Sequence, residues 1–229
     1  MRNAVIFDLD GTLVDSPSAI VETFTAAFTA LGVVPAAPEA IRATIGLPLE
    51  RAFGDLLGVA PDDPSVSAGV EQYQVQYREK ILPKAVGLLF PGVVDGLKSL
   101  REQGYALSVA TSKYYRSADA LLAAAGIREL FEIVVGADQV AKPKPAPESA
   151  FLVSRGLGVP AERSVVVGDT THDLLMAAAA GMRSIAVTYG VHDGEQLRTA
   201  APDRFADTFE EVLVHVHELL PGREEEQRP

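Results

Sequence analysis

The sequence predicts an α/β fold in which a doubly wound parallel sheet carries an inserted helical segment. Short continuous apolar runs, beginning with AVIF at residues 4–7, recur along the chain and are typical of strands buried on both faces. Helical patterns separate most of these runs, which indicates right-handed β–α–β crossovers. No convincing strand lies between residues 17 and 87, and this gap predicts the insertion.

The further strands and helices of the core alternate in the rest of the chain. Strands are expected at residues 105–110, 131–135, 164–167 and 183–188. Helices are expected at residues 93–103, 117–125, 147–156 and 174–181, the last being rich in Ala and closed by a Gly. Ligands of such sheets bind beyond the carboxyl ends of the strands, so functional residues are expected at those ends.

The inserted segment has the apolar periodicity of helices. One face contains Ile20, Phe24, Ala27, Phe28 and Leu31; a second helix is expected around residues 52–57; a third aligns Val70, Tyr73, Tyr77 and Ile81. We therefore expect an α/β core at residues 1–15 and 88–229 and a small helical domain at residues 16–87, with hinges near residues 15–17 and 84–91. The charged segment 223–229 is expected to be frayed.

Composition excludes several classes of protein. The formal net charge of −11 disfavours a general binder of nucleic acids or anionic membranes, because either needs clustered Lys and Arg. The absence of Cys removes disulfides, thiolate metal sites and a Cys nucleophile. No apolar run approaches the roughly 20 residues of a membrane span. The expectation is a cytoplasmic protein that acts on a small molecule, as a monomer or homodimer.

Acidic residues follow two of the expected strands. Asp8 and Asp10 come directly after residues 4–7, and Asp169 and Asp173 follow residues 164–167. Carboxylates at close range repel one another unless a cation or a shared proton intervenes. Convergent carboxylates without Cys or paired His favour a hard cation, Mg²⁺ before Zn²⁺. The alternatives are that Asp8 and Asp10 only cap a turn and that Asp173 is only a helix N-cap.

A second group of residues is suited to binding phosphate. Thr111 and Ser112 end another expected strand, and Lys142 lies in the segment AKPKPAP that follows the next one. Hydroxyls and a lysine beside a cation form a phosphate-binding set. Thr111 and Ser112 could instead belong to a simple loop. Lys144, two residues later in the same segment, is the competing lysine.

Four segments resemble the motifs of haloacid dehalogenase superfamily phosphatases: DLDGT at residues 8–12, VATS at 109–112, KPKP at 142–145 and GDTTHD at 168–173. They occur in the order and at the spacing of that family, and the resemblance covers about residues 4–220. The subgroup is the one with a helical cap inserted after the first motif, subfamily IA with a C1 cap, and the phosphoglycolate phosphatases are the most similar group. The resemblance implies a Rossmann-like core and a bound Mg²⁺.

The resemblance also implies a role for each motif residue. Asp8 is similar to the nucleophile that becomes an aspartyl-phosphate, and Asp10 to the general acid/base whose backbone carbonyl also binds Mg²⁺. Asp169 resembles a further metal ligand, and Asp173 a ligand or an anchor for metal-bound waters.

The remaining motif residues resemble the phosphate-binding part of the family's site. Thr111 and the backbone of Ser112 would hold phosphate oxygens. Lys142 is similar to the lysine that neutralises charge on nucleophile and phosphate, because the family pattern aligns with it rather than with Lys144. Gly11 lets the backbone turn close to the phosphate, and Thr12 orients the loop.

Among the reactions of the family, the residues favour hydrolysis of a phosphomonoester. Dehalogenases lack the second aspartate that is present here as Asp10. Phosphonate-cleaving relatives use a cap lysine, and the cap lysines here, Lys80 and Lys84, lie late in the segment. Ile20 stands where sugar-phosphate mutases commonly carry a histidine. A β-phosphoglucomutase-like isomerase and a non-catalytic metabolite- or partner-binding protein remain the less favoured alternatives.

The substrate depends on the cap. Its arginines are Arg42, Arg51 and Arg78, and a small acidic substrate such as 2-phosphoglycolate needs one of them in the pocket. We expect Arg51, because Gly46 and Pro48 mark a nearby loop; a solvated surface arginine is the alternative reading. A pyrophosphatase, a 5′-nucleotidase and a broad sugar-phosphate phosphatase fit the sequence as well.

Overall fold

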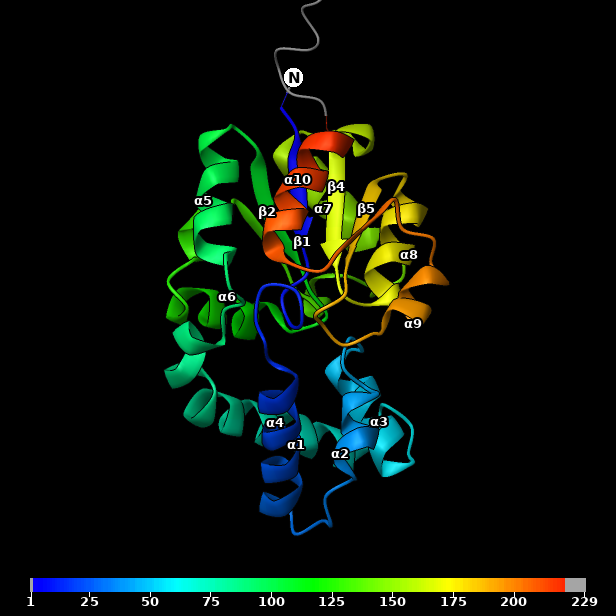
Figure 1. Cartoon of the computed structure of the whole chain (residues 1–229). Helices are drawn as coiled ribbons and strands as arrows, with labels where there is room; N and C mark the ends of the chain where they lie inside the picture. The colour runs from blue at the N-terminus through cyan, green and yellow to red at the C-terminus, as the bar shows by residue number, and fades with distance from the viewer. Residues whose placement is uncertain (1, 221–229) are drawn as a thin grey trace, which may run out of the picture.

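The predicted α/β class is confirmed. The computed structural model describes residues 2–220, so the charged segment 223–229 lies outside the described residues. Within residues 2–220, one six-stranded sheet has the order β3-β2-β1-β4-β5-β6, and all its neighbouring strands are parallel (Figure 1). The strands are β1 (Ala4–Phe7), β2 (Ala106–Ala110), β3 (Ile133–Val135), β4 (Ser164–Gly168), β5 (Arg183–Val187) and β6 (Arg204–Ala206).

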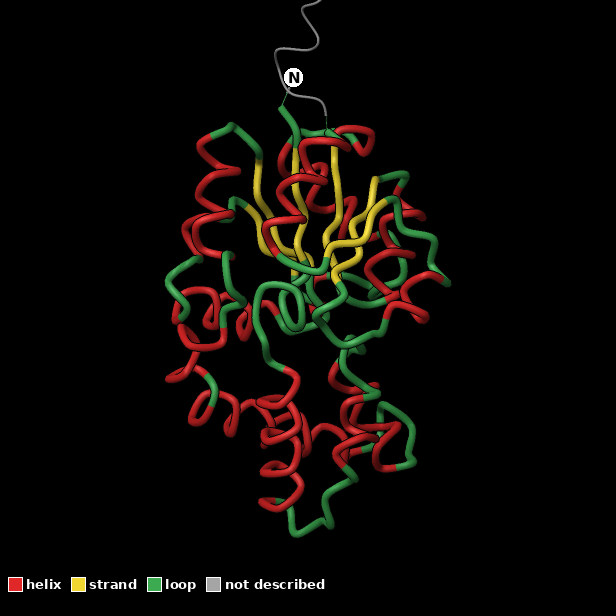
Figure 2. Tube along the Cα trace, in the orientation of Figure 1, coloured by secondary structure: helices red, strands yellow, loops and turns green. Residues whose placement is uncertain are grey.

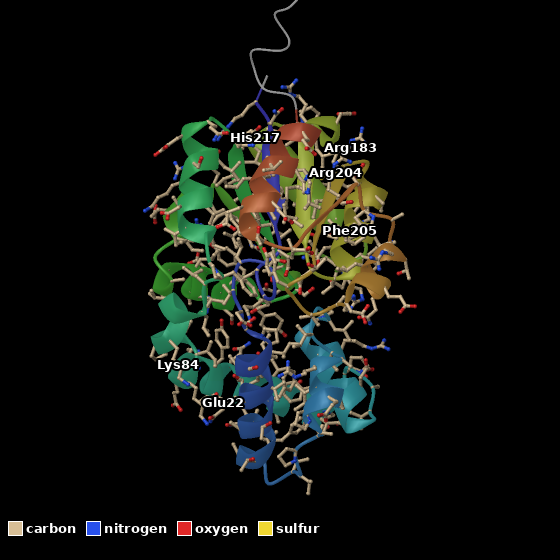
Figure 3. All side chains as sticks on the ribbon, in the orientation of Figure 1. Glu22, Lys84, Arg183, Arg204, Phe205 and His217 are labelled. Atoms are coloured by element: carbon tan, nitrogen blue, oxygen red, sulfur yellow. The ribbon has the colours of Figure 1, made fainter. Side chains whose placement is uncertain are left out.

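Helices join the strands and cover the sheet. They are α5 (Val93–Glu102), α6 (Tyr115–Ala124), α7 (Glu148–Leu157), α8 (Thr171–Ala180), α9 (Gly194–Arg198) and α10 (Phe209–Leu219). Strand β6 and helices α9 and α10 were not expected from the sequence. Strand β6 has three residues at the edge of the sheet, and Arg204, its first residue, is exposed and pairs with Glu218 of α10 (Figure 3). Because this strand is short and partly exposed, its residues form no continuous apolar run from which it could be predicted.

Both faces of the sheet are buried, and side chains alternate between two cores. Phe7 points to the face covered by α5 and α10, where its ring stacks on Phe209 at a centroid distance of 6.0 Å. Ile6 points to the opposite face and packs with residues of α7 and α8, including Val153 and Met176. This burial on both faces explains why the strands appear in the sequence as continuous apolar runs.

The segment between β1 and α5 contains helices and no strand among its described residues (Figure 2). Its elements are α1 (Pro17–Ala30), α2 (Pro38–Arg42), α3 (Leu49–Leu57), α4 (Pro64–Lys80) and a 3₁₀ segment (Leu82–Leu88). Their core is aromatic: Phe24 and Phe53 lie 4.7 Å apart between ring centroids, and Phe24 and Tyr73 lie 4.8 Å apart. Gly69 of α4 admits Phe53, because a Cβ there would lie 2.6 Å from its ring.

This helical segment lies beyond the carboxyl ends of the strands, on the side where ligands of such sheets bind (Figure 1). Its two connections to the core run side by side. The Asp15 N–H donates to the Leu88 carbonyl at 2.7 Å, and the Phe90 N–H donates to the Leu13 carbonyl at 3.1 Å. These connections coincide with the expected hinges. None of the helices within residues 2–220 has the length and apolar character needed to cross a membrane.

Candidate active site

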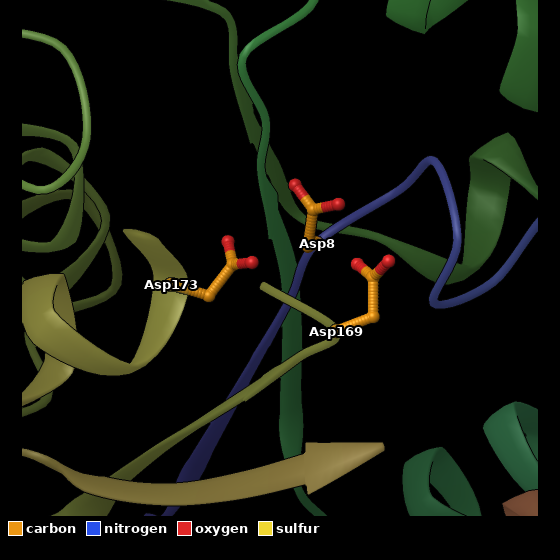
Figure 4. Close-up of side chains that lie close together, drawn as sticks. All are labelled: Asp8, Asp169 and Asp173. Atoms are coloured by element: carbon orange, nitrogen blue, oxygen red, sulfur yellow. The ribbon is translucent and has the colours of Figure 1, made fainter. Parts of the chain in front are cut away.

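Three buried carboxylates converge at the carboxyl edge of the sheet (Figure 4). Asp8 directly follows β1, Asp169 directly follows β4, and Asp173 lies in the first turn of α8. One oxygen of each lies within 4.8 Å of the others. They meet because β1 and β4 are neighbours in a parallel sheet, so their carboxyl ends lie at the same edge.

The environment opposes ionisation of two of these groups, Asp8 and Asp169. Burial raises the pKa of Asp8 well above its usual range; the Lys144 ammonium counteracts the rise, and Asp173 and Asp169 add to it. Burial, and then the charge of Asp173, raise the pKa of Asp169 to about 7, although hydrogen bonds from Val191 and Thr12 act in the opposite direction. The cluster therefore has less positive charge than its three carboxylates need, although the Lys144 ammonium lies beside it.

The donor set fits a divalent cation. Three carboxylates face one ammonium, so a divalent cation would balance the fully ionised cluster. All the donors are hard oxygen atoms, which suit Mg²⁺. The carboxylate of Asp10 does not belong to the cluster, which leaves its backbone carbonyl as the atom expected to bind metal.

The lysine at the site is Lys144, and the prediction that Lys142 lies there is wrong. Lys144 is 7% exposed, its Nζ donates to Asp8 Oδ1 at 2.6 Å, and it also pairs with Asp173. Lys142 is exposed, and its backbone N–H donates to Glu148 Oε2 at 2.8 Å near the start of α7. Each lysine precedes a proline, so the local pattern could not distinguish them. The bonds between Glu148 and the 141–142 backbone fix the loop so that the second lysine points inward.

Asp173 is not the N-cap that the sequence offered as an alternative, but it takes part in the capping box at the start of α8. Its Oδ2 accepts hydrogen bonds from the Thr170 N–H at 3.1 Å and from the Thr170 hydroxyl at 2.6 Å, at the start of α8. Its Oδ1 faces Lys144. The N-cap residue is Thr170 rather than Asp173. Asp173 thus stabilises the helix start and still contributes a carboxylate to the cluster.

The loop after β1 is tightly packed against Asp169. Gly11 has φ +86°, and a Cβ there would lie 2.1 Å from Asp169 Oδ2, so a side chain at this position is excluded on both grounds. The Thr12 hydroxyl donates to Asp169 Oδ1 at 3.0 Å. The expected turn at Gly11 and the orienting function of Thr12 thus have a common basis, because both hold the loop against this carboxylate.

A loop after β5 completes the surroundings of Asp169. The Val191 N–H donates to Asp169 Oδ2 at 2.8 Å, and the Tyr189 hydroxyl donates to the Thr12 carbonyl at 3.2 Å. At Gly190 a Cβ would lie 2.3 Å from the Cβ of Asp169. The position of this loop directly after the last clear apolar run was the one sequence signal for it.

Asp10 faces the pocket and has a partner that sequence reasoning missed. Lys113 Nζ lies 3.0 Å from Asp10 Oδ2, and the Ser16 hydroxyl donates to Asp10 Oδ1 at 2.6 Å. Burial by itself would lower the pKa of Lys113, but Asp10, Tyr77 and Tyr73 together outweigh burial, and the pKa is raised. Lys113 also lies 4.5 Å from the ring centroid of Tyr77 in α4. A cation directly after the hydroxyl pair of residues 111–112 was the signal that could have revealed it.

Thr111 and Ser112 lie at the pocket, as expected, together with Asp8 and Asp10. The Ser112 hydroxyl donates across the pocket to the Gly46 carbonyl at 2.7 Å. A second contact between core and helical segment joins the Tyr114 hydroxyl to Glu50 Oε1. The helical segment is therefore closed over the carboxyl edge of the sheet.

Arg51 does not reach the pocket, so the expectation that it faces the substrate is wrong. Its side chain is 62% exposed, and its Nε lies 2.9 Å from Asp55 Oδ1, one turn along α3. Leu49 and Ala52, on another face of the same helix, line the pocket instead. Lys84 is also remote: it lies at the surface, 4.0 Å from Glu22 of α1 (Figure 3).

These features, a doubly wound sheet with convergent aspartates and an inserted helical segment, define a class of hydrolase. The model of the haloacid dehalogenase-like hydrolase family matches residues 5–187. The chain belongs to this family and is an enzyme of the hydrolase class, as the four motifs predicted.

Two curated relatives show which members of the family this chain is similar to. The chain is 54% identical over 220 residues to the Dickeya dadantii protein named "Probable phosphatase IndB", covering 96% of each chain. It is 34% identical to a phosphoglycolate phosphatase of Salmonella typhi, covering 91% of this chain and 90% of that protein. The predicted similarity to phosphoglycolate phosphatases is therefore confirmed.

Solved structures agree with this assignment. A haloacid dehalogenase-like hydrolase of Streptococcus pneumoniae superimposes with a TM-score of 0.78 at 30% identity, covering 93% of this chain and 98% of that one. CbbY of Rhodobacter sphaeroides, solved in complex with phosphate, gives a TM-score of 0.76 at 27% identity, covering 93% and 96%.

Proposed function

We propose that the protein is a Mg²⁺-dependent phosphatase that hydrolyses a small phosphomonoester through an aspartyl-phosphate on Asp8. One observation carries the proposal. The buried Asp8–Lys144 pair adjoins a carboxylate cluster with the donor set for a divalent cation, and Asp8 also faces a pocket that contains Asp10. Relatives named as phosphatases, and a structural neighbour solved with phosphate, support it.

The metal would be held by Asp8, Asp169, the carbonyl of Asp10, and Asp173 directly or through water. Bound there, Mg²⁺ supplies positive charge that offsets the phosphate oxygens. Lys144 adds a fixed ammonium beside Asp8. It favours the anionic form of the nucleophile and lessens its repulsion of an anionic substrate.

In the first step an oxygen of Asp8 attacks phosphorus, and the bond from phosphorus to the leaving oxygen breaks. Asp10 gives its proton to that oxygen, so the leaving group departs as an alcohol. Thr111 and the backbone of Ser112 hold phosphate oxygens. Lys113 is a positioning residue, because its contact with Asp10 Oδ2 holds that carboxyl group at the pocket.

In the second step water attacks the aspartyl-phosphate, and Asp10 takes the proton from that water. The bond between phosphorus and Asp8 breaks, which releases inorganic phosphate and restores both carboxyl groups to their starting states. The closed helical segment would exclude water in the first step and open for release, with movement at residues 15–17 and 84–91. We therefore treat residues 16–87 as the cap and residues 1–15 with 88–229 as the catalytic core.

A mutase is disfavoured by the pocket itself. Ile20 lines it at the position where the mutases commonly have a histidine, and an isoleucine side chain cannot transfer a proton. Four substrate classes remain open. Phosphoglycolate is the substrate named for a relative, and pyrophosphate, nucleotides and sugar phosphates are the alternatives that fit the sequence.

The test is release of inorganic phosphate from such a panel, with Mg²⁺ and with EDTA. Asp8→Asn should be inactive but folded, and acid quenching of the wild type during turnover should trap phosphate on the peptide that contains Asp8. Asp10→Asn should slow the second step and increase the trapped fraction. Turnover that persists in Asp8→Asn, or that ignores EDTA, would overturn the proposal.

A further inference from the structure

The wall that the cap contributes to the pocket is mostly apolar, with Thr44, Tyr73 and Gln74 as its polar residues. From the cap, Ile20 and Phe24 of α1, Ile45, Leu47, and Ala52 of α3 line it. Three of these side chains, Phe24, Ile45 and Ala52, are at most 6% exposed, so they form a fixed surface rather than a flexible rim. The leaving group of a substrate bound at Asp8 must lie against this surface, because phosphorus lies at the core side of the pocket.

Positive charge is missing from this wall. All three cap arginines, Arg42, Arg51 and Arg78, are exposed, and none lines the pocket. Arg51 pairs with Asp55, and Arg42 donates to the Ser18 hydroxyl at 3.3 Å. The one lysine that lines the pocket within residues 2–220 is Lys113, and its ammonium group is already engaged by Asp10 rather than directed at the apolar wall.

Acidic side chains, by contrast, lie at or near the pocket. Asp8 and Asp10 line the pocket, and Glu50 bonds to the hydroxyl of Tyr114, itself a lining residue. A carboxylate or second phosphate on the leaving group would lose its hydration among apolar side chains and gain no counter-ion. It would also be repelled by these acidic groups. A neutral carbon framework meets neither penalty and gains from burial against the apolar wall.

From this we infer that the enzyme selects phosphomonoesters whose leaving group is uncharged and largely apolar, and discriminates against charged leaving groups such as those of 2-phosphoglycolate and pyrophosphate. The inference rests on the proposed function and specifies its substrate class. It also reverses the preference for 2-phosphoglycolate that the family resemblance suggested, because Arg51, the residue expected to bind the carboxylate of that substrate, does not line the pocket. Gln74 of α4, which lines the pocket, is the position at which this selectivity can be changed.

Three phenolic phosphates test the inference with Mg²⁺ present: phenyl phosphate, para-carbamoylphenyl phosphate and para-carboxyphenyl phosphate. The last two have the same shape and differ in charge. We expect kcat/KM for the carbamoyl compound to exceed that for the carboxyl compound by about tenfold or more. The two leaving groups also differ slightly in acidity, so a variant supplies an internal reference.

Gln74→Arg should place a cation in the pocket and lower the ratio of carbamoyl to carboxyl kcat/KM at least about fivefold. Gln76→Arg is the matched control: it adds the same charge on α4, but Gln76 lies in an outer groove with Glu22 and Lys80. Its ratio should equal that of the wild type. A change in the ratio between variants does not depend on the intrinsic reactivity of the two esters.

The outcomes separate the two proposals. Efficient hydrolysis of 2-phosphoglycolate, pyrophosphate or the carboxyl ester, with kcat/KM equal to or above that of the neutral esters, would overturn the inference and leave the phosphatase standing. Absence of Mg²⁺-dependent release from every compound would overturn the proposed function itself. If Gln74→Arg fails to fold, the ratio of kcat/KM for the neutral and charged esters in the wild type decides whether the inference holds.

Discussion

Lys144 Nζ lies 2.6 Å from Asp8 Oδ1 inside the protein, while Lys142, two residues earlier in the same KPKP segment, is exposed. The buried ammonium faces Asp8 and Asp173 together. Burial would lower the pKa of Lys144, but the charges of Asp173 and Asp8 outweigh burial and raise it, so the residue stays charged. This pairing is the fixed positive charge of the site.

Replacement of Lys144 should greatly reduce turnover and stability, whereas replacement of Lys142 should change neither by much. Lys144→Met leaves buried carboxylates without their ammonium partner, so we expect kcat to fall at least about 100-fold and the free energy of unfolding to fall by about 3–5 kcal/mol in EDTA. Lys142→Met should change kcat by no more than about twofold and the free energy of unfolding by no more than about 0.5 kcal/mol, because Lys142 lies at the surface. Phosphate release and urea unfolding measure both. Loss of turnover in Lys142→Met alone would contradict the assignment.

A pair of glycines tests the packing of the first motif. Gly11 and Gly32 both have positive φ, +86° and +71°, but a Cβ at Gly32 meets nothing within 4 Å, whereas one at Gly11 meets Asp169. Gly32→Ala should cost only the backbone strain, about 1–2 kcal/mol. Gly11→Ala should in addition displace Asp169, abolish Mg²⁺-dependent turnover and weaken stabilisation by Mg²⁺. Thermal unfolding with and without Mg²⁺ compares them; equal effects of the two substitutions would refute this reading.

The raised pKa of Asp169 predicts how stability varies with pH in the absence of metal. Its pKa is about 7 in the folded protein against a usual 3.8. Between these values the folded protein keeps a proton that the unfolded chain has released, so the free energy of unfolding falls as pH rises through this window and stays low above it. We expect EDTA-treated protein to lose thermal stability from about pH 4 to about pH 7. Addition of Mg²⁺ should restore the thermal stability near pH 7.

Asp169→Asn is the control for that experiment. It removes the titrating group, so above pH 7 in EDTA it should melt above the wild type, by about 2–4 °C for each kcal/mol recovered. Its stability should respond much less to Mg²⁺. A wild type that is at least as stable as Asp169→Asn under these conditions would show that the buried carboxylate is not strained in the metal-free protein.

The contact between Tyr114 and Glu50 should favour the closed cap. Tyr114→Phe and Glu50→Ala each remove a hydrogen bond to a charged group, worth about 1.5–3 kcal/mol, so we expect KM to rise about tenfold in either variant. The double variant should be no worse than the singles, because they remove the same interaction. Arg51→Gln, on the same helix but facing Asp55, should leave KM unchanged. Additive effects of Tyr114→Phe and Glu50→Ala would contradict a direct contact.

Several features of the site could be predicted because they are local. Asp8 and Asp169 end apolar runs, and in a parallel sheet the ends of neighbouring strands must lie at one edge. Gly11 was expected at a turn, and it has the positive φ that only glycine adopts without strain. The five continuous apolar runs became strands because both faces of the sheet are buried. The short edge strand β6 lacked that signal.

The family, the sheet, the inserted helices and the carboxylates could all be predicted from the sequence, since each depends on residue type, period or order along the chain. Three features depend on the folded structure: which lysine points inward, which residue partners Asp10, and what faces the leaving group. Lys142 and Lys144 have nearly identical neighbours, and their burial is set by how Glu148 and α7 hold the loop. Likewise Arg51 points to solvent because Leu49 and Ala52 occupy the inner face of α3. Side-chain direction depends on packing between segments distant in sequence, and local pattern does not encode it.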